Sequence, residues 1–191
     1  MTTPLFRRAA RLLAVTGLLP LLPLTAPAVD GWLHWRGPHQ NGTSDETGLP
    51  ATVGPENLLW TYDMAGRGEA VIAAGRVYSY GYRGEGPDLR EYLSCLDAET
   101  GVLQWEIGFN DFLSDIVYNR YAIGAPTVDA ETGNIYLMTG PGIFVCVSPA
   151  GKILWEVSMM ERFGMLTFPN GRRGAPVVEG DLVIHHCITS Y

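Results

Sequence analysis

Charged side chains are scarce in this 191-residue chain, and positive charge is the scarcer sign. Asp, Glu, Lys and Arg make up 17% of the residues, against about 25% in an average globular protein. The 13 basic and 20 acidic side chains give a net charge of −7, and Lys and Arg form no run beyond the first eleven positions. Binding the phosphates of a nucleic acid needs a concentrated positive field. We therefore expect no nucleic-acid partner.

Cysteine is also rare, with three residues, Cys95, Cys146 and Cys187, and no C-x-x-C pair. Exported chains often carry disulfides, but three is an odd number. Each cysteine lies in an apolar, strand-like run, which predicts small buried hydrophobic side chains. A Cys95–Cys146 bridge is the alternative, and it would have to join two separate sheets.

The N-terminal region has no hydrophobic run long enough to span a membrane. The apolar stretch from Leu12 to Leu24 has 13 residues and contains two prolines, whereas a spanning helix needs roughly 20 residues. A basic region precedes it, made of Arg7, Arg8 and Arg11. An A-x-A cleavage pattern follows at Ala26–Ala28, so residues 1–28 are predicted to be a signal peptide, with a transmembrane helix as the alternative. We expect an exported protein, located in the periplasm, in the cell envelope or secreted, with no membrane span in the mature chain.

Turn-forming and aromatic residues are abundant. The 23 Gly and 13 Pro are about 19% of the chain (36 of 191), above the roughly 12% of average usage. Hydrophobic residues reach 47%, and Trp and Tyr together number 14. This composition is too apolar for a disordered chain and too rich in Gly and Pro for a helical bundle. It favours an all-β protein with many turns.

Two sequence elements recur at a fixed spacing. The segment Leu96–Glu106 is echoed by Val147–Glu156, and tryptophans fall at positions 60, 105 and 155. A second element, Gly-Ala-Pro-Thr-Val or a close variant, begins at Gly68, Gly124 and Gly174. It starts 19 residues after Trp105 (124 − 105) and 19 residues after Trp155 (174 − 155). Because both elements keep the same phase, the chain is predicted to contain structural repeats.

Each repeat is predicted to form four short antiparallel strands, because runs rich in Val, Ile, Tyr and Trp alternate with Gly, Pro, Asp and Asn. In residues 68–108 the expected strands are 69–73, 76–82, 89–96 and 102–108. In residues 124–158 they are 125–129, 134–139, 142–147 and 152–158. A lone strand is expected at Leu58–Met64, and residues 174–191 are predicted to be the start of a third repeat.

Four-stranded repeats of about 40 to 50 residues are typical of β-propeller blades. The pattern resembles the PQQ-like (quinoprotein-type) β-propeller repeat family, including its tryptophan-docking motif A-x-D-x-x-x-G-x-x-x-W. The motif lies at Cys95–Trp105, with Cys in place of Ala; its second copy, Cys146–Trp155, is one residue shorter and has Ser148 in place of Asp. The segment Trp32–Pro38, within a lead-in of residues 29–57, also looks like the N-terminal segment of exported multi-blade members.

The resemblance implies an incomplete PQQ-like β-propeller over residues 58–191, with two full blades plus parts of others. A propeller needs at least four blades, so the chain is predicted to be a fragment of a longer protein. In such a fold each tryptophan ring stacks on a Gly-containing turn of the neighbouring blade, and its N–H meets a carbonyl there. The residues expected to dock the blades are Trp60, Trp105, Trp155, Gly101, Gly151 and Asp97.

The two 19-residue spans after Trp105 and Trp155 are longer than a crossover between blades needs, so they are predicted to form loops on one face. Their mixture of aromatic and charged side chains favours a binding face for a protein or a small polar ligand. Capping of the disc by local salt bridges is the alternative. The charged residues of this predicted face are Asp111, Asp115, Arg120, Arg162, Arg172 and Arg173.

No catalytic or metal-binding residue is predicted. Asn110, Asp111 and Asp115 do not match the spacing of a Ca²⁺ loop. His185 and His186 are expected to lie in a strand, where neighbouring side chains point to opposite faces and cannot hold one ion.

The sequence therefore favours a non-catalytic, exported propeller that acts as a binding or assembly scaffold, with no evident cofactor. The alternative implied by the family is a PQQ- and Ca²⁺-dependent dehydrogenase whose catalytic residues lie in sequence beyond this chain. In that branch PQQ and Ca²⁺ sit on the propeller axis, usually with a disulfide between adjacent cysteines. This chain has no adjacent cysteines.

Overall fold

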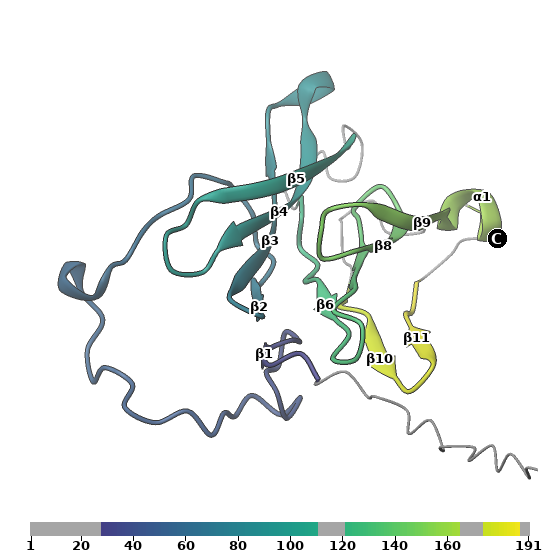
Figure 1. Cartoon of the computed structure of the whole chain (residues 1–191). Coiled ribbons are helices and arrows are strands. Elements are labelled where there is room, and N and C mark those ends of the chain that lie inside the picture. Colours follow the sequence, from purple (N-terminus) through teal and green to yellow (C-terminus); the bar gives the residue numbers. More distant parts are fainter. Residues whose placement is uncertain (1–27, 111–120, 165–173, 188–191) are drawn as a thin grey trace, which may run out of the picture.

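The fold is all-β, and the residues that the structure describes form three antiparallel sheets and little helix. The structure is a computed structural model, and it describes residues 28–110, 121–164 and 174–187 (Figure 1). None of the helices in these ranges has the length and apolar character needed to cross a membrane.

The first sheet has five strands in the order β1-β2-β3-β4-β5. Their bounds are β1 Gly31–Trp32, β2 Val71–Ala73, β3 Arg76–Arg83, β4 Arg90–Asp97 and β5 Leu103–Asn110. Strands β2 to β5 are the four strands predicted for residues 68–108, with ends that differ by no more than two residues. The predicted set did not include β1, which comes from the lead-in segment and pairs with β2 through Trp32 and Ile72.

The second sheet repeats this arrangement with four strands, β6-β7-β8-β9. Their bounds are β6 Thr127–Val128, β7 Ile135–Met138, β8 Ile143–Val147 and β9 Ile153–Ser158. The two sheets share one irregularity: the register shifts directly after the pair Cys95–Trp105 in the first sheet and after Cys146–Trp155 in the second. The sequence repeat is therefore also a repeat of strand register.

The third sheet contains β10 Val177–Glu179 and β11 Leu182–Ile184, joined as a hairpin. Three short helical segments complete the described structure: η1 Pro55–Asn57, η2 Gly86–Asp88 and α1 Met159–Phe163. The strand expected at Leu58–Met64 is not formed. In the described residues, the backbone pairing of this region with the first sheet is an isolated antiparallel bridge between Ala65 and Tyr82.

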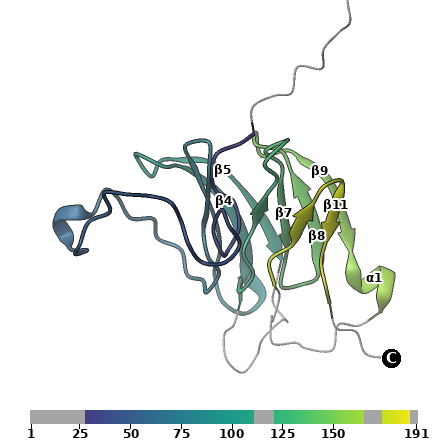
Figure 2. The same ribbon diagram turned by 90° about the horizontal axis from the view of Figure 1, so that it is seen from below.

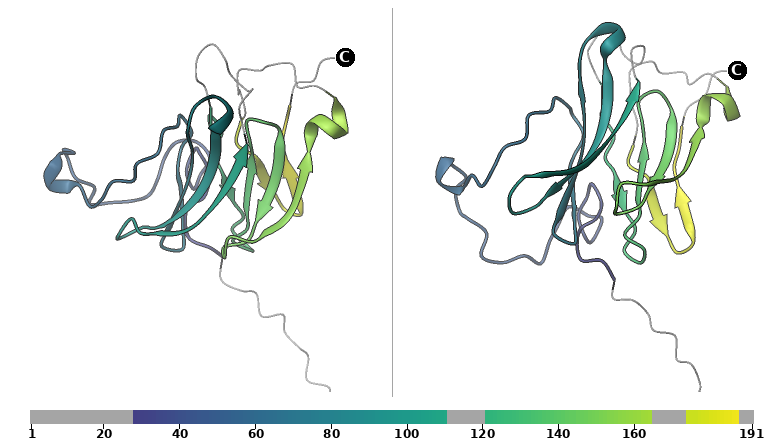
Figure 3. Two further views of the ribbon diagram at one scale, coloured as in Figure 1. Left: turned by 90° about the horizontal axis from the view of Figure 1, so that it is seen from above. Right: turned by 45° about the horizontal axis from the view of Figure 1, so that its top comes forward.

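The three sheets lie side by side, with β2, β6 and β10 next to one another (Figures 1, 2 and 3). Strand β6 contacts both β2 and β10, while β5 and β9 lie at the outer edges of their sheets. One continuous cluster of buried side chains fills the space between the first two sheets. It includes Val71, Tyr80 and Leu93 from the first sheet and Ile135 and Val145 from the second.

The lead-in segment connects β2 of the first sheet with β6 of the second sheet and with the turn after β6. The Val29 N–H donates a hydrogen bond to the Ala130 carbonyl at 2.6 Å, and the Val128 N–H donates to the Leu33 carbonyl at 2.9 Å. Because β1 pairs with β2 on its other side, residues 29–33 bridge both sheets. After this bridge the chain runs out in a wide loop before it returns to β2 (Figure 1).

All three cysteines are free thiols, so the alternative of a Cys95–Cys146 disulfide is wrong. Cys95 and Cys146 are buried, as the sequence predicted, and Cys187 is half-buried. Burial raises the pKa of the Cys95 and Cys146 thiols. Since the thiolate is the reactive form, both effects reduce their reactivity.

Thiol labelling should separate the three cysteines. In the native chain we expect Cys187 to react with an aromatic disulfide reagent at least about 100-fold faster than the other two, because Cys95 and Cys146 react only after local opening. Denaturant should make all three react at similar rates. Rapid labelling of Cys95 or Cys146 in the native chain, located by peptide mapping, would contradict the buried placement.

Candidate functional site

Trp60 lies against the β4–β5 turn of the first sheet. Its indole N–H donates a hydrogen bond to the Ala98 carbonyl at 3.0 Å. Gly101 in the same turn has a φ of +70°, and a Cβ at this position would lie 2.5 Å from Cδ2 of Trp60. The turn therefore needs glycine both for its left-handed backbone and for the closeness of the ring.

Trp105 makes the same contact between the first and second sheets. Its indole N–H donates to the Pro149 carbonyl at 3.0 Å, and a Cβ on Gly151 (φ +79°) would lie 2.7 Å from the ring. The guanidinium of Arg76 donates to the same carbonyl at 2.9 Å. One turn of the second sheet thus receives two side chains from the first.

Trp155 occupies the equivalent position in the second sheet but has no turn against it in the described structure. Its ring packs on Tyr136 at 5.9 Å and 38°, as Trp105 packs on Tyr78 at 5.8 Å and 42°. Trp155 is nevertheless 39% exposed. No acceptor for its indole N–H is present among the residues that the structure describes. Of the three tryptophans predicted to dock, two are in contact with a turn and one is not.

Asp97 shapes its turn and does not touch Trp60 through its carboxylate. Oδ1 accepts hydrogen bonds from the backbone N–H and the hydroxyl of Thr100, at 2.8 and 2.7 Å, and from the Glu99 N–H at 3.1 Å. The hydrogen bonds from Thr100 lower the pKa of Asp97. In the second sheet Ser148 takes the position of Asp97. The Ser148 hydroxyl accepts a hydrogen bond from the Lys152 N–H at 3.2 Å. Both residues fix a turn whose carbonyl faces a tryptophan.

Arg83 and Glu106 form an ion pair at the point where the segment around Trp60 meets the first sheet. Their closest N–O distance is 2.9 Å. Arg83 also donates to the Tyr62 hydroxyl at 2.7 Å, and Ser94 donates to Glu106 at 2.7 Å. Burial favours a higher pKa for Glu106, but the hydrogen bonds from Ser94, Arg83 and Tyr62 outweigh it, so the pKa of Glu106 is lowered. The cluster holds a charged carboxylate at neutral pH.

Acid should weaken this cluster. Because the pKa of Glu106 is lower in the folded chain than its ordinary value of 4.5, its contribution to stability is present above about pH 4.5 and is lost as the pH falls through the folded value. We expect Glu106→Gln to cost about 1 kcal/mol at pH 7, a value that allows for the partial exposure of Arg83. The difference from the wild-type chain should shrink towards pH 3. Denaturant unfolding from pH 3 to 7 measures this difference in the free energy of unfolding, and Glu99→Gln in the exposed turn is the control. A difference that does not change with pH would contradict the prediction.

A second carboxyl group, that of Glu91, is fully buried between the first two sheets. Its Oε1 accepts from the Ala122 N–H at 2.6 Å, and its Oε2 accepts from the Gly140 N–H at 2.7 Å. The Tyr80 hydroxyl donates to the same carboxyl group and accepts from the Gly140 N–H at 3.1 Å. Glu91 therefore ties β4 to Gly140 in the second repeat and to Ala122 just before it.

The long connections after β5 and β9 begin at the same face of the molecule. Asn110 ends β5 beside Arg90, Ser158 ends β9 beside Ile143, and the Gly140–Glu91 contact places these ends together. That both loops share this face stays a prediction, because residues 111–120 and 165–173 lie outside the described residues. We call this face the loop face. Arg162 lies here on α1, exposed to solvent. The other five charged residues predicted for it lie outside the described residues: Asp111, Asp115, Arg120, Arg172 and Arg173.

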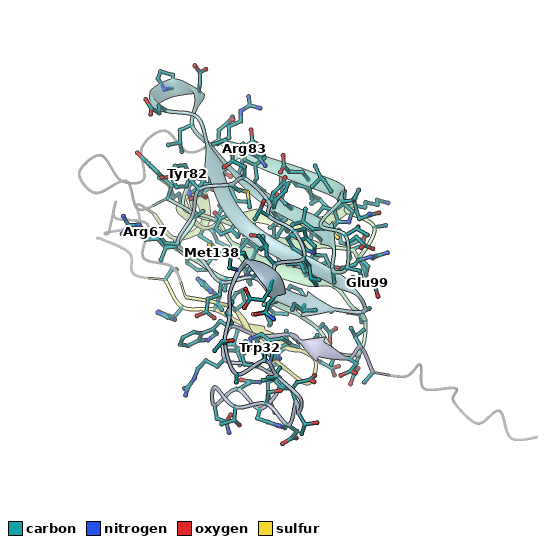
Figure 4. The ribbon with its side chains drawn as sticks, turned by 90° about the vertical axis from the view of Figure 1, so that its left-hand side faces the viewer. Trp32, Arg67, Tyr82, Arg83, Glu99 and Met138 are labelled. Atoms are coloured by element: carbon teal, nitrogen blue, oxygen red, sulfur yellow. The ribbon has the colours of Figure 1, made fainter. Side chains whose placement is uncertain are left out.

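A cleft of about 640 Å³ opens at the loop face of the first sheet. Tyr82 and Tyr121 line it with an edge-to-face ring contact at 5.1 Å. The rest of its lining comes from Ala65, Arg83, residues 84–86 and Leu89. Figure 4 shows Tyr82 and Arg83 at the end of the sheet opposite Glu99. The cleft offers aromatic surface beside Arg83, which is paired with Glu106, and beside Glu85, so it suits a polar ring or a peptide side chain.

Within the described ranges, no group of three or more His, Cys, Asp and Glu side chains is arranged to hold a metal ion. His185 and His186 follow β11 instead of lying in it, and their rings stack at 5.8 Å and 20°. The expectation that these side chains point to opposite faces of a strand is therefore wrong, because the strand ends at Ile184.

Sequence reasoning missed two features of this region, although a signal exists for each. Glu91 alternates with Leu93 and Cys95 along β4, and this spacing places it on the same face as two core residues. Helix α1 begins with Ser158-Met159-Met160-Glu161, an S-x-x-E pattern typical of a helix start. The Ser158 hydroxyl accepts from the Glu161 N–H at 3.2 Å.

Comparison with known proteins adds no relative. No protein-family model matches the chain, and no curated protein matches it. The functional interpretation is therefore based on the contacts described above, of which the repeated tryptophan–turn contact is the most specific.

Proposed function

We propose that this chain is part of an exported PQQ-like β-propeller repeat protein that acts as a non-catalytic binding or assembly scaffold. The observation that carries the proposal is the Trp105–Pro149 contact, which joins two sheets of matching register through a ring, a carbonyl and a left-handed glycine. Ring stacking against a turn stabilises the fold and performs no catalytic step. These residues therefore hold a framework together.

The arrangement of the sheets supports a propeller. Neighbouring sheets meet through β2 and β6 and through β6 and β10, and β3 to β5 and β7 to β9 follow in order away from these strands. A hydroxyl of the second sheet, that of Thr127, donates to the Pro176 carbonyl ahead of β10 at 2.6 Å. Repetition of one sheet-to-sheet step around a common axis generates a propeller.

The loop face supports a binding role. Its cleft is lined by Tyr82, Arg83 and Tyr121, and Arg162 is exposed on the same face. Tyr and Arg are the residue types that contribute most to protein–protein contacts. A rigid sheet framework with varied loops at one face is a common way to build a binding surface.

Site-specific photo-crosslinking tests the binding role. A photoreactive amino acid is placed at Glu85 on the cleft rim, and a matched control is placed at Glu99, which is also exposed but lies at the opposite end of the sheet. In cells that produce the protein we expect a discrete adduct from position 85 and none from position 99. The absence of an adduct from position 85, or equal labelling from both positions, would contradict the proposal.

A second measurement tests the dehydrogenase alternative directly. The full-length protein, of which this chain is proposed to be a part, is titrated with PQQ in the presence of Ca²⁺ by calorimetry and is assayed for dye reduction with alcohols and sugars. We expect neither saturable PQQ binding nor PQQ-dependent dye reduction. Either activity would replace the scaffold function with a quinone-dependent oxidoreductase and would leave the propeller architecture untouched.

A further inference from the structure

The lead-in segment and the start of the first sheet enclose a cleft of about 710 Å³. Its floor is apolar, because Trp32 of β1 and Ile72 of β2 are directly opposite each other, and opposite residues project their side chains from the same face of a sheet. Ile72 is 44% exposed, although both of its neighbours in β2 are buried. We call this cavity the lead-in cleft. The lining residues that matter for its chemistry are Asp30, Trp32, His39, Asp45, Glu46 and Ile72.

One wall of the lead-in cleft is a loop that is held in shape by its own contacts. The Gly37 N–H donates a hydrogen bond to the His34 carbonyl at 2.8 Å. The turn lies on the ring of Trp32, since a Cβ on Gly37 (φ +78°) would be 2.6 Å from Cη2. Farther along the loop, Nε2 of His39 and Oδ2 of Asp45 are 3.0 Å apart. A wall that is ordered before binding reduces the entropic cost of holding a ligand.

The other wall is formed by Asp30 and by the turn between β2 and β3. The Ala74 N–H in this turn donates to the Asp30 carbonyl at 3.1 Å. The Gly75 carbonyl accepts from the Ala98 N–H of the β4–β5 turn at 3.0 Å. Glu99, the next residue of the β4–β5 turn, lies at the end of the sheet opposite the loop face (Figure 4). This wall therefore lies away from the loop face.

Both walls of the lead-in cleft carry negative charge. Asp30 is exposed on one wall, and Asp45 and Glu46 are exposed on the other. The described residues that line the cleft include no Lys or Arg, and the ring of His39 is engaged by Asp45. A cleft lined by one sign of charge concentrates ions of the opposite sign. Since no group of side chains in the described ranges is arranged to hold a metal ion, the cleft suits an organic cation.

We propose that the lead-in cleft binds a small, linear organic dication, such as an aliphatic diamine. One charged end meets Asp30, the other meets Asp45 and Glu46, and the apolar chain between them lies over Trp32 and Ile72. The cleft volume is within the range of small-molecule sites. This site goes beyond the proposed function, and it depends neither on the propeller architecture nor on the cleft at the loop face.

The distribution of charge favours a free diamine over a basic peptide. A single lysine or arginine side chain brings one charge, so it would leave the carboxylate of the other wall without a counter-charge. Two basic side chains joined by a backbone would place peptide N–H and C=O groups over the apolar floor of Trp32 and Ile72. Polar groups that lose water without gaining a hydrogen-bond partner weaken binding. The methylene chain of a diamine has no such groups.

Calorimetric titration with cadaverine, a linear aliphatic diamine, tests the proposal on the full-length protein, of which this chain is proposed to be a part. We expect saturable binding at one site. The matched ligand is pentylamine, which has the same chain and lacks one ammonium group. It should bind at least tenfold more weakly, because it leaves the carboxylate on one wall unpaired. This comparison uses the unaltered protein, so it does not depend on the folding of any variant.

Variants of the protein locate the binding site. Asp30→Asn and Glu46→Gln should each weaken cadaverine binding at least fivefold and should reduce its preference over pentylamine. The matched control is Glu56→Gln, an exposed residue of the same lead-in segment that does not line the cleft, and it should change binding by less than twofold. Ile72→Ala should weaken binding at least threefold without a change of charge, whereas Leu182→Ala, also exposed, should have no effect.

Four results would overturn the proposal. They are no saturable binding, equal affinities for cadaverine and pentylamine, cadaverine binding that Asp30→Asn and Glu46→Gln leave unchanged, and at least tenfold tighter binding of a tripeptide amide with arginine at both ends. The last result would assign the cleft to a protein partner. Crosslinking from position 85 tests the loop face separately, so failure of the diamine site is distinguishable from failure of the scaffold function.

Discussion

Replacing Glu91 with leucine is expected to lower the free energy of unfolding by about 4 kcal/mol, because two buried backbone N–H groups lose their hydrogen bonds to its buried carboxyl group. Those groups belong to Ala122 and Gly140, which donate to Glu91 at 2.6 and 2.7 Å. Glu91 itself is fully buried, so water does not replace the lost carboxyl oxygens. A loss of this size is a large part of the total stability of an ordinary domain.

Denaturant unfolding of the full chain measures the effect. Glu91→Gln keeps one oxygen but turns an NH₂ group towards the other donor, and we expect it to fall between wild type and Glu91→Leu. Glu99→Leu makes the same chemical change in an exposed turn and should stay within about 0.5 kcal/mol of wild type. A Glu91→Leu chain as stable as the Glu99→Leu control would show that the carboxyl group does not clamp the two repeats.

Amide hydrogen exchange provides a local readout of the same change. In Glu91→Gln, the amides of Ala122 and Gly140 should lose protection more than those of Leu93 and Val145, which lie in the shared core. Uniform loss of protection across the core would instead indicate general destabilisation. The comparison separates a specific clamp from a merely buried position.

The strands were predictable because their signals are local. Val, Ile and Tyr runs end at turns such as Asp97–Gly101, where an aspartate oxygen accepts neighbouring N–H groups and a glycine takes a φ of +70°. Each of these features acts over five residues or fewer. The ends of β2 to β5 and of β6 to β9 accordingly fall within two residues of the predicted ends.

The remaining features depend on residues far apart in the sequence. Strand β1 contains only Gly31 and Trp32 and exists because β2 offers it an edge. The Glu91 cluster needs Gly140, which is 49 residues away. Leu58–Met64 has a strand-like sequence but forms no ladder, because it is held by side chains, through Trp60 and Tyr62, more than by backbone pairing. Propensity alone does not reveal whether a partner edge is present.

Trp105→Ala is expected to cost about 3 kcal/mol, through the loss of ring packing and of the hydrogen bond to Pro149. Trp155→Ala is the matched control, because Trp155 has the same strand register and the same tyrosine neighbour but lacks a turn against it in the described structure. We expect it to cost less than about 1 kcal/mol. Equal losses would mean that the contact between the sheets contributes little, and the propeller proposal would lose its main support.

Glycine substitutions then isolate the contact between ring and turn. Gly151→Ala adds backbone strain at φ +79° and also a Cβ 2.7 Å from the Trp105 ring, whereas Gly75→Ala adds the strain alone, since its φ is +72° and nothing lies within 4 Å of the new Cβ. Gly75→Ala should therefore cost about 1 kcal/mol, and Gly151→Ala at least about 1 kcal/mol more.

Combining each glycine substitution with Trp105→Ala completes the test. The extra cost of Gly151→Ala should disappear when the ring is absent, because a Cβ on Gly151 meets the Trp105 ring. The cost of Gly75→Ala should be unchanged, because a Cβ on Gly75 meets nothing within 4 Å. Additive losses at both glycines would mean that Gly151 serves its own turn and has no role in joining the sheets.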